Sequence, residues 1–328
     1  MTEEFAAAGR PGQSAPTPAP PLVVAVVVTY NRRELLLESL AAVQAQHRPP
    51  DAVLVVDNAS TDGTAAAVRA GFPAVRLAEL GDNYGGAGGF AYGMAQALRD
   101  GADLIWAMDD DTIPEPGALA ALLAARERYP GRAPAIMASA VLWTDGRPHP
   151  MNTPRAKPMA TAAERSAAAE CGCVPIRSAS FVSVLVDAAQ CKSRGLPRAD
   201  FFLWNDDFEF TTRLLRGNIG LLCPASVVVH KTRTFGGTTV DPGERFFYEV
   251  RNKIWTLRAN SLGPAERMLY TGATLRRWVR TYAAGADRRA LRACFVRGLV
   301  AGVRTSPRPN ERVLPGLAAD TAAPRPAR

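Results

Sequence analysis

The sequence has no apolar run long enough to cross a membrane as a helix. The apolar stretch at residues 22–28 is far shorter than the ~18 apolar residues that such a helix needs. Residues 1–21 also lack the apolar centre of an export signal, because Glu3 and Glu4 precede a stretch rich in Pro and Ala. We therefore expect residues 1–21 to form a disordered tail.

Cysteine is scarce, with five residues in a chain of 328, and their spacing shows no metal-ligand pairs. An odd number without such spacing favours a reduced, cytosolic protein. The sequence also lacks a Gly-rich phosphate loop ending in Lys-Ser or Lys-Thr. Its glycine run at residues 81–89 does not have the spacing of the dinucleotide-binding fingerprint. These absences argue against a disulfide-rich secreted domain, a phosphate-loop nucleotide hydrolase and nicotinamide binding.

Acidic residues are few in residues 264–328, which hold four of them against thirteen arginines. This segment therefore carries a net charge of +9, within a total of +8 for the chain. Its arginines are interleaved with apolar residues at spacings that suit amphipathic helices, which bind anionic membrane surfaces. Ordinary helices that pack on the main domain are an equally good interpretation, and a nucleic-acid patch is the weakest of the three.

Residues 22–260 alternate between short apolar runs and amphipathic segments. Strands are predicted at residues 22–29, 52–56, 75–78, 104–108, 135–143, 178–186 and 220–229. Helices are predicted at residues 34–44, 60–69, 90–99 and 116–129. This alternation predicts an α/β fold with a doubly wound, mainly parallel sheet. The polar residues 144–173 are interpreted as a variable, mobile insert, and residues 261–328 as a helical, basic appendage with a disordered end.

Three consecutive aspartates, Asp109, Asp110 and Asp111, end the apolar run at residues 104–108. In a strand, the period of two puts Asp109 and Asp111 on one face, where both can bind one divalent cation. His230 ends the strand predicted at residues 220–229, and manganese accepts imidazole beside carboxylates. A solvated acidic turn or a helix N-terminus is the alternative interpretation.

A second acidic cluster, formed by Asp206, Asp207 and Glu209, lies among aromatic residues. A carboxylate beside an apolar wall has a raised proton affinity, which suits a general base. The alternative is that Asp206 or Asp207 caps the helix that follows.

Ligands of doubly wound sheets bind beyond the carboxyl ends of the strands. Polar residues stand there at 29–31, 57–58 and 109–111, so we expect them to line one crevice. The glycine-rich residues 81–89 precede the helix predicted at residues 90–99, and their backbone N–H groups can approach a sugar or phosphate closely. A flexible surface loop is the alternative for this segment.

Taken together, these motifs resemble the inverting glycosyltransferases of family 2, which have the GT-A fold. The resemblance covers about residues 22–260. It rests on residues 29–32, 55–64, 109–111 and 206–209 and on His230. Within the family, residues 83–90 and 245–252 are most similar to the galactofuranosyltransferases that build bacterial cell-wall galactan, with related rhamnosyltransferases next.

The resemblance implies roles for individual residues. Asp207, or less favourably Asp206, is implied as the base, and Trp204 and Glu209 as lining the acceptor site. The implied ligands of a manganese or magnesium ion are Asp109, Asp111 and His230. The family's motif is often an acid-any-acid triplet, whereas all three positions are acidic here, so Asp110 is an alternative that can share or replace a ligand role. The residues implied in donor or nucleotide binding are Thr29, Tyr30, Asn31, Asp57, Asn83, Gly85, Gly86, Gly88, Gly89 and Asp110.

The resemblance implies a metal-dependent enzyme that transfers galactofuranose from UDP-galactofuranose to a lipid-linked cell-wall glycan. Inversion is a one-step displacement, so one carboxylate removes the acceptor proton while a metal neutralises charge on the leaving nucleoside diphosphate. A rhamnosyltransferase that uses dTDP-rhamnose is the alternative enzyme. A non-catalytic carbohydrate-binding or scaffold protein of the same fold is the alternative of a different class.

The expected partners are a nucleotide-sugar donor, a lipid-linked glycan acceptor and an anionic membrane surface, and no nucleic acid. The expected location is the cytoplasm, on the inner face of the plasma membrane as a peripheral protein. The oligomeric state is left open, with a homo-oligomer among the alternatives.

Overall fold

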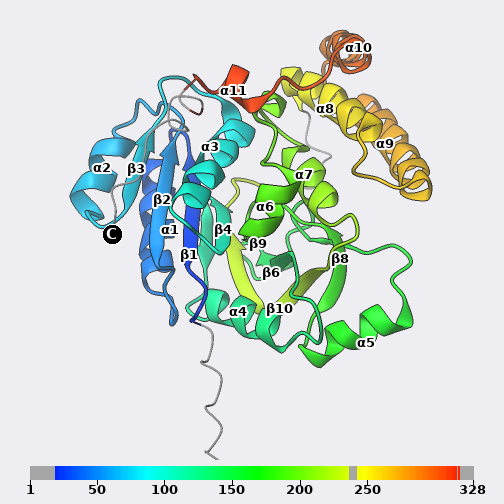
Figure 1. Cartoon of the computed structure of the whole chain (residues 1–328). Helices are drawn as coiled ribbons and strands as arrows, with labels where there is room; N and C mark the ends of the chain where they lie inside the picture. The colour runs from blue at the N-terminus through cyan, green and yellow to red at the C-terminus, as the bar shows by residue number, and fades with distance from the viewer. Residues whose placement is uncertain (1–18, 236–241, 316, 318–328) are drawn as a thin grey trace, which may run out of the picture.

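The computed structural model describes residues 19–235, 242–315 and 317, which form a mixed, mainly parallel sheet flanked by helices (Figure 1). The strand order is β3-β2-β1-β4-β9-β6-β10-β8-β7, and β5 pairs with β10. The predicted α/β class with a doubly wound sheet is therefore confirmed. Most of the tail predicted at residues 1–21, and the disordered end predicted for the C-terminal segment, lie outside the described residues.

Four parallel strands form the N-terminal half of the sheet. They are β1 (Val23–Thr29), β2 (Ala52–Asp57), β3 (Arg76–Glu79) and β4 (Leu104–Asp109). β1 lies between β2 and β4, with Val27 opposite both Val55 and Met108. Every residue of β1 is buried, because alternate side chains enter the apolar cores on the two faces of the sheet. This two-sided burial explains the unbroken apolar run in the sequence.

The second half of the sheet mixes parallel and antiparallel strands. Its strands are β5 (Thr112–Pro114), β6 (Ile136–Leu142), β7 (Arg155–Ala156), β8 (Val174–Ser178), β9 (Val184–Asp187) and β10 (Gly220–His230). β6 and β10 are parallel, whereas β9 runs antiparallel to β4 and β6. The single strand predicted at residues 178–186 is wrong, because residues 179–183 connect β8 with β9. Phe181 and Val182 of this connection pack into the cores, which makes the segment as apolar as a strand.

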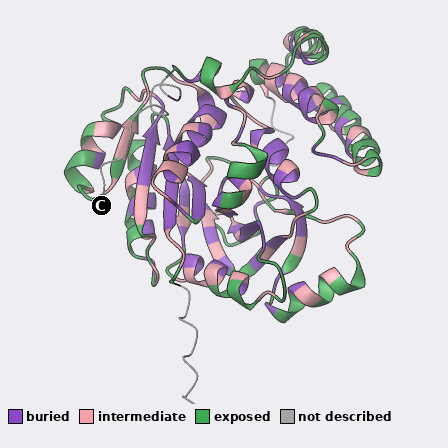
Figure 2. Ribbon diagram, viewed as in Figure 1, coloured by how far each residue is buried: buried purple, intermediate pink, exposed green. Residues whose placement is uncertain are grey.

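Helices cover both faces of the sheet, and the buried residues concentrate in the strands and the inner helix faces (Figure 2). One face packs against α1 (Arg33–Gln44), α2 (Thr64–Gly71) and α4 (Ala118–Arg128). The other packs against α3 (Gly85–Arg99), α6 (Ala188–Arg194) and α7 (Asp206–Leu214). Since β1, β2 and β4 are parallel, their carboxyl ends meet at one edge of the sheet.

Residues 144–173, predicted as a mobile insert, contain regular structure. β7 pairs with β8, and α5 (Ala162–Glu170) follows. The Thr161 hydroxyl accepts a hydrogen bond from the Glu164 N–H at 3.1 Å, and the Glu164 carboxylate accepts one from the Thr161 N–H at 2.9 Å. This reciprocal pair is a capping box, and its Thr-x-x-Glu spacing is the sequence signal for α5 that the prediction left out.

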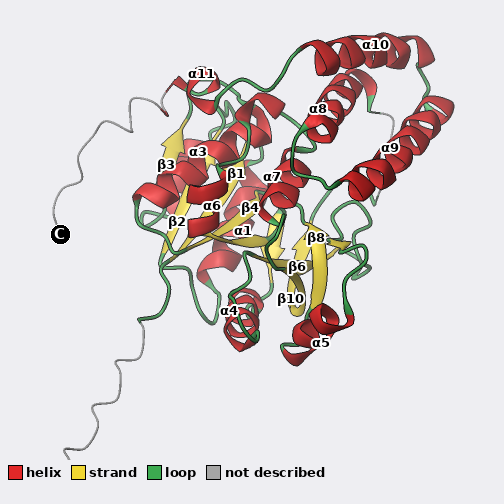
Figure 3. Ribbon diagram, turned by 45° about the vertical axis from the view of Figure 1, so that its right-hand side comes forward, coloured by secondary structure: helices red, strands yellow, loops and turns green. Residues whose placement is uncertain are grey.

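Helices dominate the chain after β10. They are the short 3₁₀ turn η2 (Gly243–Arg245), then α8 (Phe246–Arg258), α9 (Pro264–Ala284), α10 (Arg288–Arg304) and α11 (Asn310–Val313). A second 3₁₀ turn, η1 (Ala199–Phe201), lies earlier in the chain, before α7. α10 lies along α8 (Figure 3), and a Cβ at Gly298 of α10 would lie 2.9 Å from the carbonyl oxygen of Phe247. The predicted helical appendage is thus present. Among the described residues, no helix is both long and apolar enough to cross a membrane.

Candidate active site

Polar side chains gather at the edge of the sheet where the parallel strands end. Thr29 ends β1, Asp57 ends β2, Asp109 ends β4 and His230 ends β10. Thr29 lies opposite Asp57 in the register, and Asp109 lies opposite Val28. The fold therefore brings together polar residues that are up to two hundred positions apart in the chain.

Asp109, Asp111 and His230 form a cluster with the donor set of a metal site. One ligand atom from each residue lies within 4.8 Å of the others. His230 Nε2 lies 2.9 Å from Asp111 Oδ1, and His230 Nδ1 lies 3.0 Å from the side-chain oxygen of Asn152. An amide oxygen only accepts, so Nδ1 carries the hydrogen and Nε2 is turned toward the carboxylates. Two carboxylates and one imidazole suit a manganese ion.

The charges of this cluster are unbalanced. Burial, and then repulsion from Asp111, raise the pKa of Asp109 to about 7. Burial also raises the pKa of Asp110 to about 6. Burial would raise the pKa of Asp111, but hydrogen bonding and charge from His230, and then Arg32, lower it. Burial would lower the pKa of His230, but its hydrogen bond with Asp111 raises it. A divalent cation would supply the positive charge that the aspartates need.

Asp110 contacts the turn between β1 and α1. Its carboxylate accepts hydrogen bonds from the Thr29 hydroxyl at 2.9 Å and from the Tyr30 N–H at 3.4 Å. Arg32 donates to Asp110 at 3.2 Å and also pairs with Asp111. Asp110 thus holds the turn that carries Tyr30, and its implied role toward the donor or the metal stays a prediction.

The turns after β1 and β2 are joined by hydrogen bonds. The Asn31 N–H donates to the Ser60 hydroxyl at 2.9 Å, and the Asn31 side-chain oxygen accepts from the Thr61 N–H at 2.7 Å. Asp57 accepts from the Ser60 N–H at 2.9 Å. Tyr30 lies on this joined platform with 44% of its surface exposed, so its ring is accessible for stacking on a nucleotide base.

The glycine-rich segment belongs to α3, which begins at Gly85 and not near residue 90 as predicted. Gly85 has a φ of 69°, and a Cβ there would collide with the carbonyl oxygen of Phe202. A Cβ at Gly89 would collide with Val28 of β1. These glycines let α3 approach the sheet and the loop before α7, so the flexible-loop interpretation is wrong for Gly85–Gly89. The donor-binding roles implied for this segment stay predictions for Asn83, Gly85, Gly86, Gly88 and Gly89.

The loop before α7 has a strained backbone. Phe202, Trp204 and Asn205 have φ values of 63°, 64° and 64°. Such values cost about 1–3 kcal/mol for each non-glycine residue, and strain of this kind concentrates at functional sites. Trp204, implied to line the acceptor site, thus stands in a strained loop two residues before the first candidate base.

Asn252 of α8 holds this loop in place. Its side-chain amide donates toward the carbonyl oxygens of Phe201, Leu203 and Trp204, at 2.8, 2.8 and 2.9 Å. Asn252 is fully buried, so water does not compete for these bonds. The loop, and with it the start of α7, is therefore fixed from α8.

α7 begins with the two candidate bases. Asn205 is the N-cap residue of this helix, so neither Asp206 nor Asp207 is the N-cap, although the Asp207 carboxylate accepts a hydrogen bond from the Phe208 N–H of the first turn at 2.6 Å. Burial raises the pKa of both carboxyls. Asp206 is also repelled by Asp207 and Asp109, whereas Asp207 is attracted by Lys253 and Arg155. Asp206 therefore neighbours the metal-ligand cluster, and Asp207 neighbours a basic region.

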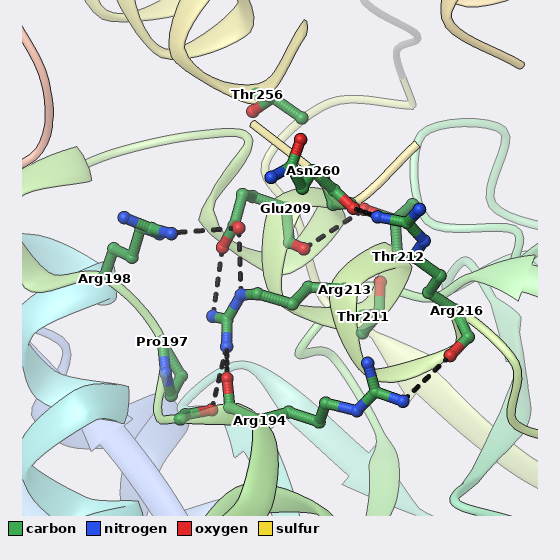
Figure 4. Close-up of polar contacts among 12 residues, drawn as sticks. Arg194, Pro197, Arg198, Glu209, Thr211, Thr212, Arg213, Arg216, Thr256 and Asn260 are labelled. Atoms are coloured by element: carbon green, nitrogen blue, oxygen red, sulfur yellow. Dashed lines mark hydrogen bonds and ion pairs between the residues drawn. The ribbon is translucent and has the colours of Figure 1, made fainter. Parts of the chain in front are cut away.

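Glu209 lies among arginines (Figure 4). Because it follows Asp207 by two residues, it lies on the other side of α7 from Asp207. Its carboxylate accepts hydrogen bonds from Arg213 at 2.9 and 3.1 Å and pairs with Arg198 at 3.4 Å. Glu209 is 1% exposed, and the two guanidinium groups compensate its buried charge. The structure does not bring Glu209 together with Asp207, and its implied acceptor role stays a prediction.

Several residues that contact the site were given no role from the sequence. They are Arg32, Asn152, Arg155, Asn252 and Lys253. Arg32 and Asn252 lie inside segments that carry the family resemblance, so the sequence could have identified them as site residues. Asn152 and Arg155 belong to the insert, where the sequence pattern gave none.

Comparison with known proteins finds sequence and structural similarity over much of the chain. The sequence profile "Glycosyl transferase family 2" matches residues 24–136. Galactofuranosyltransferase GlfT1 of Mycobacterium tuberculosis is 32% identical over 265 residues, which are 72% of this chain and 82% of that protein.

Two solved structures share the fold at low sequence identity. S. aureus TarS 1–349 in complex with UDP-GlcNAc has a TM-score of 0.60 and 16% identity, covering 89% of this chain and 82% of that chain. The chain spans about half, 52%, of the longer TarS chain. Mannosyltransferase PcManGT from Pyrobaculum calidifontis, in complex with GDP-Man and Mn2+, has a TM-score of 0.52 and 21% identity, covering 92% and 81%.

Proposed function

The chain belongs to glycosyl transferase family 2 and has the GT-A fold, and from this premise we propose that it is an inverting, metal-dependent galactofuranosyltransferase. Its donor would be UDP-galactofuranose and its acceptor a lipid-linked cell-wall glycan. The similarity to a galactofuranosyltransferase over 72% of the chain favours this sugar. The observation that carries the proposal is the division of acids between a ligand cluster at Asp109, Asp111 and His230 and a separate candidate base at Asp207.

Manganese or magnesium fits the ligand cluster. The three ligand atoms already lie within 4.8 Å of one another, and Asn152 orients His230 with Nε2 toward Asp111. A bound cation would neutralise the charge that develops on the departing nucleoside diphosphate. Of the two solved structures, the mannosyltransferase is in complex with Mn2+, which favours manganese here.

Different residues of the chain would bind the donor and remove the acceptor proton. Tyr30 would stack on the base of the donor, with Thr29 and Asp57 beside the nucleoside. Asp207 would accept the proton of the acceptor hydroxyl, whose oxygen attacks the anomeric carbon from the face opposite the leaving diphosphate. Because burial raises the pKa of Asp207, its carboxylate is a stronger base than an exposed aspartate.

Nucleotide binding tests this proposal and separates it from its alternatives. Calorimetric titration with UDP, dTDP and GDP, each with manganese and with chelator, is expected to give metal-dependent binding that is tightest for UDP. Selectivity for dTDP would instead support a rhamnosyltransferase. Failure to bind any of the three would contradict a transferase and favour a non-catalytic carbohydrate-binding or scaffold protein.

The proposed location is the inner face of the plasma membrane, with α9 and α10 as the contact. On α9, the apolar residues Met268, Leu275 and Val279 are 76%, 53% and 69% exposed. Val296 and Val303 of α10 are 50% and 56% exposed. Each set lies along one stripe of its helix, among arginines, as expected for helices that rest on an anionic membrane.

Vesicle binding tests this location. Leu275→Ser combined with Val279→Ser is expected to weaken association with phosphatidylglycerol vesicles about tenfold, because two apolar side chains no longer enter the membrane. Met159→Ser combined with Val174→Ser removes two apolar residues that are 78% and 44% exposed on other elements, and should leave association unchanged. Equal losses in the two pairs, or no loss in the first, would contradict the membrane contact. Sedimentation with vesicles measures both.

A further inference from the structure

Five basic side chains line a pocket of about 230 Å³ between β7, α8 and α9. They are Arg155, Lys253, Arg276, Arg277 and Arg280. Among the described residues, the acidic group within ion-pairing distance of these five is Glu249, which lies 3.4 Å from Arg277. The buried threonines Thr274 and Thr281 add hydroxyl groups to the lining. Such an excess of positive charge and hydrogen-bond donors suits an anion.

Lys253 shows that the pocket is more than a group of solvated arginines. It is 5% exposed, and within the described ranges no ion pair satisfies its ammonium group. Its contact is the Phe208 ring, 4.3 Å from Nζ. Burial lowers the pKa of Lys253 to about 8. The charges of Glu249 and Asp207 oppose this shift, but neither carboxylate lies within ion-pairing distance of Lys253 in the described part of the chain, so an anion in the adjoining pocket would add the missing direct partner.

The pocket adjoins the candidate base. Lys253 and Arg155 both act electrostatically on Asp207, and Arg155 lies 5.3 Å from the ring of the next residue, Phe208. Asp206, by contrast, is close enough to Asp109 to be repelled by it. An anion in the pocket therefore lies on the Asp207 side of the site, whereas a donor diphosphate belongs with the metal-ligand cluster.

Apolar surface lies next to the pocket on the same helix. Arg276 and Arg280 line the pocket from α9, and the adjacent Leu275 and Val279 are 53% and 69% exposed. The positively charged pocket and the exposed apolar side chains of α9 are therefore adjacent. A ligand that joins an anionic group to a hydrocarbon chain would match both features.

We propose that this pocket binds the phosphate or diphosphate group of the lipid-linked acceptor, with Lys253, Arg276 and Arg280 contacting the anion. The hydrocarbon chain lies along Leu275 and Val279, and the sugar end extends toward Asp207. This inference rests on the proposed function and names the chemistry of its acceptor.

Farnesyl diphosphate is a soluble probe that joins the two features. Calorimetric titration of the full chain in the presence of chelator measures its binding without a metal. Arg276→Gln combined with Arg280→Gln is expected to weaken this binding at least about tenfold, because two charged donors are lost. Both arginines are exposed, so the double variant should fold, which thermal unfolding verifies.

A matched variant and two further probes sharpen the result. Arg289→Gln combined with Arg292→Gln removes the same charge from exposed positions on α10 and should leave the affinity unchanged. A lipid-binding site is expected to hold farnesyl diphosphate more tightly than inorganic diphosphate, and farnesol more weakly than either. Equal affinity for the two diphosphates would overturn the lipid assignment. Equal losses in the two double variants, or no binding by the natural chain, would overturn the site itself.

Two measurements distinguish a failure of this inference from a failure of the proposed function. UDP binding with manganese reports on the donor site and should be unchanged in the Arg276 and Arg280 double variant. A chain that transfers galactofuranose but does not bind farnesyl diphosphate would disprove the pocket assignment alone. A chain that binds farnesyl diphosphate through these arginines but transfers no galactofuranose would disprove the proposed function.

Discussion

An Asp207→Asn variant is expected to transfer sugar about 10²–10⁴-fold more slowly than the natural chain while binding the donor with unchanged affinity. The amide has nearly the size of the carboxylate but cannot accept the proton of the acceptor hydroxyl. The substitution should not unfold the protein, because burial already disfavours the charge of Asp207. Initial rates at saturating donor, together with calorimetric titration of UDP and manganese, measure the two effects.

Glu209→Gln is the matched control for this loss. It removes a second buried carboxylate from α7, but one that faces Arg213 and Arg198. We expect this variant to keep its maximal rate and to lose thermal stability, because its arginine partners are left uncompensated. A raised acceptor KM in Glu209→Gln would support the acceptor role that the resemblance implies. If Glu209→Gln lowered the maximal rate as far as Asp207→Asn, the assignment of the base would be wrong.

An Asp111→Ala variant is expected to lose the donor affinity that depends on metal, by about 100-fold or more. Asp111 contributes one of the three candidate ligand atoms and also holds His230 at 2.9 Å. Loss of partners that merely orient a ligand typically costs 10–100-fold in metal affinity, so loss of a ligand should cost at least as much. The binding of UDP that remains in chelator should be the same in the variant and the natural chain.

Asn152→Ala tests the same metal site with a smaller expected loss of manganese affinity. Asn152 orients His230 from the insert without contributing a ligand atom, so we expect a smaller loss of manganese affinity, about 10–100-fold. Asp111→Asn is a control for misfolding, because its side chain keeps the shape of aspartate. It should fold like the natural chain and still lose metal-dependent donor affinity. If Asp111→Ala and Asp207→Asn weakened donor binding equally, the proposed division between ligand and base would fail.

The parts of the fold that depend on local patterns were predictable. β1 and β4 are buried on both faces, so consecutive positions carry apolar side chains and the sequence shows an uninterrupted apolar run. Parallel strands end at one edge, so the gathering of Thr29, Asp57 and the aspartates near Asp109 followed from the alternation of strands and helices. The split of residues 174–187 into β8 and β9 did not follow, because Phe181 packs into the core from the connection between them.

The parts of the site that depend on long-range contacts were not predictable. Asn152 reaches His230 from an insert whose own pattern is weak, and Lys253 reaches the region of Asp207 from a helix beyond β10. Even the acidic pair was ambiguous, because a helix cap and a general base use the same residue types. The structure identifies Asn205, in the left-handed conformation, as the N-cap residue, and the role of Asp207 as the base stays a prediction.

The anchoring of the loop before α7 by Asn252 has a consequence for recombination between relatives. α8 determines where Asp207 stands, and α10 packs on α8 through Gly298. The helices that line the proposed acceptor pocket therefore also position the proposed base, so they cannot be exchanged without affecting Asp207. A chimera that exchanges acceptor preference should cross over before β7 at Arg155, so that Arg155, the loop before α7, and α7 to α10 all come from one parent.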